Sequence, residues 1–97
     1  MSAYSSLQNT QSYGLSQNIT ANTLIKTGTG NVQGVVVNSH TNGTLKLWGA
    51  LSATGTVLFN TITFASGPQY LPLFGAKFLT GLYSDVGGTI DLTIIYN

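Results

Sequence analysis

Charge is the property that this sequence has least of. Only 5% of its 97 residues are charged, whereas roughly 25% are charged in an average soluble domain. The charged side chains are Lys26, Lys46, Lys77, Asp85 and Asp91, and they give a net charge of +1 at pH 7. Three scattered lysines without any arginine cannot neutralise the phosphates of a nucleic acid or form a polybasic membrane patch. We therefore expect neither a nucleic acid nor a membrane as a partner.

Cysteine and glutamate are absent and histidine occurs once, which leaves few groups for chemistry. Without cysteine there are no disulfides and no thiolate ligands. The chain also has no second histidine that could share catalysis or metal binding with His40. A calcium site takes about six to eight oxygens, usually from several carboxylates. Asp85 lies in the turn-like SDVGG and Asp91 in an alternating strand, so we interpret them as a turn residue and a solvated strand residue, not as the carboxylate pair of a glycoside hydrolase. We expect no enzymatic activity, no catalytic residue, no metal and no cofactor.

Long hydrophobic runs are also missing. No apolar stretch approaches the roughly 20 residues of a membrane helix, and MSAYSSLQNT has neither the basic nor the apolar region of a secretory signal peptide. We therefore expect a soluble protein that is not exported by the standard route. Small proteins that stay dispersed usually carry about 2–8 net charges, so a net charge of +1 leaves little repulsion between copies. This favours a role within an assembly.

From position 24 onward the sequence consists of short apolar runs separated by glycine, asparagine and Ser-Gly. Threonine, valine, isoleucine and aromatic residues dominate these runs, as in β-strands, and turns recur about every 8–12 residues. In the last run, Ile90, Leu92 and Ile94 alternate with polar residues. We predict an all-β domain over residues 24–97, an antiparallel, jelly-roll-like β-sandwich of about seven or eight short strands.

Residues 1–23 are polar and precede this domain. Their few apolar residues keep neither a helical nor a strand period. Two interpretations are open: a poorly ordered terminus, or an N-terminal arm that becomes ordered only in the assembly, along a neighbouring subunit or partner.

The stretch NSHTNGTLKLW, residues 38–48, predicts a hairpin around Asn42 and Gly43. A three-residue loop with Gly43 in the left-handed conformation separates the faces best. It places Val35, Val37, Leu45 and Leu47 on one face, because a one-residue slip would move every side chain to the other face. His40 then lies beside the turn on the mostly polar face, and we interpret it as structural.

Trp48, the single tryptophan, falls on the same polar face. An exposed tryptophan often marks contact with a partner or a sugar, but it could equally pack under the N-terminal arm or at a subunit interface. Tyr70 and Tyr83 are candidates for a stacking platform with Trp48. Tyr4 and Tyr13, in the arm, are further candidate partner contacts.

A resemblance to known proteins extends over residues 32–97. It is carried by three segments, GVVVNSHTNGTLKLW, GTVLFNTITFASG and AKFLTGLYSDVGGTIDLTIIYN. They resemble small all-β structural proteins of tailed bacteriophages, among them capsid decoration or cement proteins and head-fibre modules. The resemblance implies a non-enzymatic virion protein that binds the capsid exterior at junctions between subunits, as a homodimer or homotrimer, and stabilises it. Its partners would be the major capsid protein and itself. It would be made in the host cytoplasm and end on the capsid surface.

Two other functions fit the same pattern. The first is a carbohydrate- or receptor-binding β-sandwich module of a phage fibre, which predicts that Trp48 is exposed together with Tyr70 or Tyr83. The second is a component of the tail or baseplate with the same fold. Fold alone does not decide among these functions.

Overall fold

The computed structural model describes residues 14–97, and all regular structure in this part of the chain is β-strand. The candidate contacts Tyr4 and Tyr13 lie outside the described residues. The described part also contains no helix that could span a membrane. The strands are β1 (Leu15–Ile19), β2 (Thr23–Thr27), β3 (Gly30–Trp48), β4 (Val57–Thr63), β5 (Gln69–Phe78) and β6 (Gly81–Tyr96).

The predictions of an all-β fold and of antiparallel pairing are confirmed, but the number of strands is not. The described residues form six strands in one hydrogen-bonded antiparallel sheet, where about seven or eight short strands were expected. The difference arises because β3 and β6, with 19 and 16 residues, continue through positions where the sequence predicts turns. Of the predicted N-terminal arm, β1 and Thr23, the first residue of β2, pair with β6.

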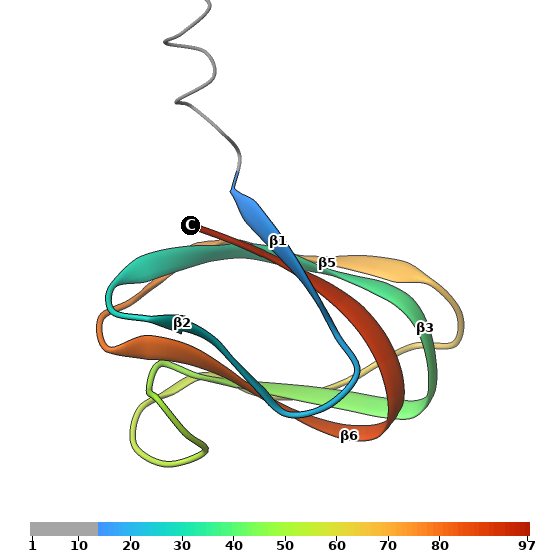
Figure 1. Ribbon diagram of the computed structural model, residues 1–97. Coiled ribbons are helices and arrows are strands. Elements are labelled where there is room, and N and C mark those ends of the chain that lie inside the picture. Colours follow the sequence, from blue (N-terminus) through green and yellow to red (C-terminus); the bar gives the residue numbers. More distant parts are fainter. Residues whose placement is uncertain (1–13) are drawn as a thin grey trace, which may run out of the picture.

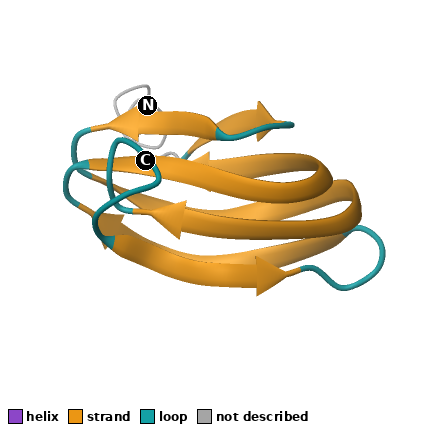
Figure 2. Cartoon of the chain, turned by 90° about the horizontal axis from the view of Figure 1, so that it is seen from below, coloured by secondary structure: helices purple, strands orange, loops and turns teal. Residues whose placement is uncertain are grey.

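The long strands β3 and β6 pair with each other from Val32 opposite Tyr96 to Trp48 opposite Tyr83. Both bend near the middle, so that each contributes to two sections of the sheet (Figure 1). The first section has the order β1, β6, β3, β5, and the second has the order β2, β6, β3, β4. Seen from below, the strands lie side by side with their connections at the two ends of the molecule (Figure 2).

The predicted hairpin at Asn42 and Gly43 is wrong, because β3 does not reverse there. Between Thr41 and Thr44 the register with β6 shifts, which makes the Asn-Gly pair a bulge in a continuous strand. Asn42, not Gly43, adopts the left-handed conformation, with a φ of 52°. Gly88 on β6, with a φ of 74°, lies against the backbone of Asn42. A bulge increases local twist and bends a strand, and here it turns both long strands together.

The predicted division into an apolar and a polar face is confirmed along β3. Val35, Val37, Leu45 and Leu47 are all fully buried, since alternate residues of a strand point to the same side whether or not the chain reverses. One core cluster takes residues from both sections of the sheet. Its buried members are Ile19, Ile25, Val32, Val35, Val37, Leu45, Leu47, Phe64, Leu73, Phe78, Leu82, Ile90, Leu92 and Ile94.

Candidate functional site

His40 uses both ring nitrogens to hold the bend of β3. Nδ1 accepts a hydrogen bond from the backbone N–H of Gly43 at 2.9 Å, and Nε2 contacts the carbonyl oxygen of Ala65. Because Nδ1 is an acceptor, this network assigns the ring proton to Nε2. The ring also packs edge-on against Phe64, with 5.4 Å between centroids. These contacts join the bulge to the chain that follows β4, which supports a structural role for His40.

The two aspartates occupy different environments on β6. Asp91 Oδ1 accepts hydrogen bonds from the side-chain amides of Asn18 on β1, at 2.7 Å, and of Asn38 on β3, at 3.1 Å. Asp91 therefore links three neighbouring strands of the first section. Asp85 lies opposite Lys46 in the second section. Each aspartate has a structural neighbourhood of its own, and the two do not share a site.

Trp48 and Tyr83 are brought together on the outer face of the second section. Leu47 is fully buried, so the adjacent Trp48 points to the other side of the sheet. Trp48 lies opposite Tyr83 on β6 and opposite Val57 on β4, and Tyr83 in turn lies opposite Leu24 on β2. We call these four residues the Trp48 row. Leu24 and Val57 at its ends are 42% and 41% exposed.

The ring of Trp48 is partly covered within the chain. Trp48 is half-buried, and the Lys46 ammonium nitrogen lies 4.4 Å from the centroid of its ring. This is the geometry of a cation–π contact. The indole Nε1 is buried and has no hydrogen-bond partner among the described residues. Trp48 is thus neither freely exposed nor part of the core, and its two interpretations, a partner or sugar contact and packing under the arm or at a subunit interface, stay predictions.

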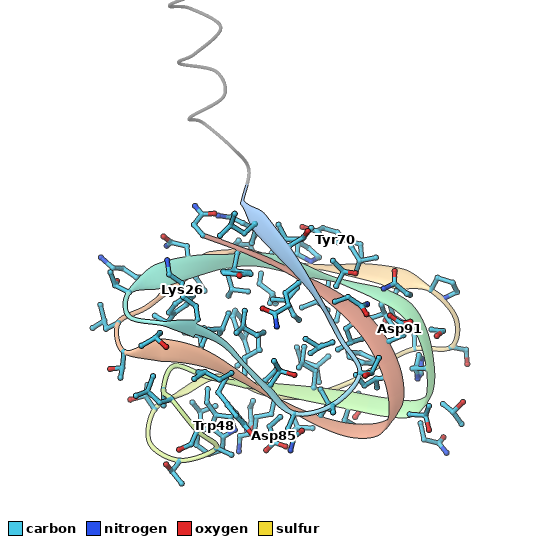
Figure 3. The ribbon with its side chains drawn as sticks, in the orientation of Figure 1. Lys26, Trp48, Tyr70, Asp85 and Asp91 are labelled. Carbon is cyan, nitrogen blue, oxygen red and sulfur yellow. The ribbon has the colours of Figure 1, made fainter. Side chains whose placement is uncertain are left out.

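Tyr70 is not part of the Trp48 row. It lies on β5 opposite Val36, in the first section, and is 53% exposed. Its ring crosses the backbone of β3 at Gly34, where a Cβ atom would lie 2.6 Å from the Tyr70 Cζ atom. Figure 3 shows Trp48 beside Asp85 on the lower limb of the molecule, with Tyr70 on the opposite limb. Trp48 and Tyr83 therefore lie side by side, both half-buried, whereas Tyr70 lies in the other section of the sheet.

The most exposed large hydrophobic side chain within residues 14–97 was not among the predicted contacts. Phe74 on β5 is 88% exposed, and its backbone is left-handed, with a φ of 60°. Gly75, which follows it, is also left-handed, with a φ of 68°. Between Val32 and Gly34 the pairing with β5 skips these positions, so Phe74 stands on a bulge. The Phe-Gly dipeptide inside an apolar run is the signal that could have indicated it. Leu79, in the turn after β5, is 72% exposed.

Within residues 14–97, no three side chains from histidine, cysteine, aspartate and glutamate come together as metal ligands would. Comparison with models of protein families found no match, and neither did comparison with curated proteins or with solved structures.

Proposed function

We propose that the chain is a non-enzymatic structural protein of a virion, a decoration or cement protein that binds the exterior of a bacteriophage capsid and stabilises it. The observation that carries this proposal is the display of large apolar side chains on a surface with almost no charge. Phe74, Leu79 and Tyr70 are all more than half exposed, and the net charge is +1. Such a surface is a liability in a free monomer and is suited to permanent contact with other subunits.

The finer description of the fold belongs to the same proposal. The two sections of the bent sheet pack as the layers of a β-sandwich of the jelly-roll-like kind, with the shared core between them. The partners are the major capsid protein and further copies of this chain, as a homodimer or homotrimer. The protein is made in the host cytoplasm and resides on the capsid surface. Many weak contacts on one lattice add up to firm attachment.

The proposal is tested by adding purified protein to virions of the phage that encodes it, from which this protein has been stripped or deleted. We expect saturable co-sedimentation with the particles, and weaker binding by the Phe74→Ser variant. The Thr54→Ser variant is the matched control, since Thr54 is exposed in the loop between β3 and β4. Failure of the unaltered protein to sediment with the particles would contradict the proposal.

A carbohydrate-binding module is the second candidate, and the Trp48 row favours it. Neighbouring aromatic side chains on a flat sheet face can stack against sugar rings. Because Trp48 is the single tryptophan, its fluorescence reports on this face alone. Titration with cell-surface oligosaccharides would then change the emission saturably, and the change would be lost in Tyr83→Ala. Unchanged emission across a glycan panel would remove this candidate.

Immunolabelling of the tail instead of the head would indicate a tail or baseplate component.

A further inference from the structure

Each section of the sheet ends in two edge strands, and three of the four edges carry features that oppose pairing with another chain. On β2, Lys26 interrupts the apolar run, and the register shifts between Leu24 and Lys26. On β4, the pairing with β3 shifts twice within seven residues. On β5, Pro72 has no N–H to donate, and Phe74 opens a bulge. Charge, proline and bulges are the usual means by which proteins block strand addition at an edge.

The fourth edge strand, β1, has none of these features. Its sequence LSQNI contains no charge and no proline, and all five residues pair in unbroken register with β6, from Leu15 opposite Tyr96 to Ile19 opposite Leu92. Ser16 and Asn18 are exposed, and Leu15 is 58% exposed. Among the described residues, no strand pairs with the other side of β1. Within residues 14–97, its outward N–H and C=O groups therefore form a regular ladder that no other strand occupies.

We propose that β1 is a self-association edge, which pairs antiparallel with β1 of a second copy of this chain across a two-fold axis. The inference rests on the proposed function insofar as that function includes self-association, and it adds the surface responsible. The first sections of the two copies then form one continuous sheet, in the order β5, β3, β6, β1 and, in the second copy, β1, β6, β3, β5.

A second copy fits this edge better than a charged or strongly apolar partner. β1 itself carries no charge, and the neighbouring carboxylate of Asp91 on β6 is hydrogen-bonded to Asn18 and Asn38. With Gln17 on the axis, Ser16 of each copy lies opposite Asn18 of the other. Because the Asn18 amide already donates to Asp91 Oδ1 and to the Leu92 carbonyl oxygen, the Ser16 hydroxyl donates to Asn18 Oδ1 of the other copy. On the other face, Leu15 lies beside Ile19 of the second copy, which covers part of its exposed surface. A two-fold contact of this kind is self-complementary and closes at two copies.

Disulfide trapping tests the contact directly. The chain has no cysteine, so a single introduced cysteine can form a disulfide only between two copies. We expect Gln17→Cys to give a covalent dimer under mild oxidation of the folded protein, because position 17 would lie opposite itself. Thr61→Cys, exposed on the edge strand β4, is the matched control and should remain monomeric. Equal trapping at both positions, or none at position 17, would overturn the proposal.

The solution mass, measured by light scattering after size exclusion, tests self-association without a covalent link. The unaltered protein should be a dimer. Ser16→Lys places like charges across the axis and should raise the dissociation constant roughly tenfold, whereas Thr61→Lys should not change it. Circular dichroism of each variant shows whether it is folded. A monomer at millimolar concentration, or a dimer unaffected by Ser16→Lys, would overturn the β1 contact.

These measurements use no particles, so they separate the two proposals. A monomer that still binds capsids would leave the decoration function standing and remove the β1 contact. A β1-linked dimer that binds no capsid would do the reverse.

Discussion

At the scale of single residues, both the exposure and the backbone conformation of Phe74 are unfavourable for the isolated protein. It is 88% exposed and left-handed at a φ of 60°. A left-handed backbone costs an ordinary residue about 1–2 kcal/mol, and an exposed ring recovers little of that by burial. Strained backbone often occurs where a side chain is held for binding. We interpret Phe74 as a contact residue for this reason.

Phe74→Asn should make the isolated protein more stable, by about 1 kcal/mol, because asparagine tolerates the left-handed region. The midpoint of urea unfolding measures this change. Leu79→Asn is the control, since Leu79 is 72% exposed and has no positive φ; its unfolding midpoint should stay nearly constant. Lower stability of Phe74→Asn would show that the ring supports the fold. Unchanged capsid binding by this variant would show that the ring is not a contact.

At the same scale, the sequence predicted a structural role for His40 but not the contacts that its ring makes. Its isolation from other titratable residues indicated a structural role, and alternation along the strand predicted the burial of Val35 and Leu45. The contact with Ala65 joins positions 25 residues apart, and no local pattern carries that information. Phe74 was missed because its exposure follows from a bulge, and an apolar run by itself suggests burial.

At the scale of elements, the continuous strands β3 and β6 were mistaken for several shorter strands. Asn-Gly and Gly-Gly favour a left-handed backbone, and both hairpin turns and β-bulges use that conformation. The choice between reversal and bending depends on the neighbouring strand. Here β6 follows β3 on both sides of the bend, which requires contacts between residues far apart in the sequence. Strand composition was therefore predictable, whereas strand continuity was not.

Gly88→Ala tests the bend. A Cβ atom at this position would contact the carbonyl oxygen of Asn42 and would lie 2.6 Å from that of Thr41. Gly67→Ala is the matched control, because Gly67 has a φ of 84° and no atom near the same position. The loss of unfolding free energy should be larger for Gly88→Ala by about 1–3 kcal/mol, the usual cost of overpacking. Equal losses in urea unfolding would contradict the close approach of the two long strands.

At the scale of the whole molecule, low charge and exposed apolar side chains are the two features behind the proposed use, which is contact with other protein subunits. The sequence indicated this use through its net charge of +1. The surface that mediates each contact depends on the order of strands in the sheet, which single-sequence patterns do not fix. The protected edges of β2, β4 and β5, with the regular edge of β1, became visible only in the sheet.

Heat-induced release of the viral genome tests the proposed stabilising role. Particles with and without this protein are heated with a DNA-binding dye, and the temperature of DNA release is recorded. We expect particles that carry the protein to release DNA at a higher temperature, and re-addition of purified protein to restore that temperature. If particles with the protein bound release DNA at the same temperature as particles that lack it, the protein does not act as a cement.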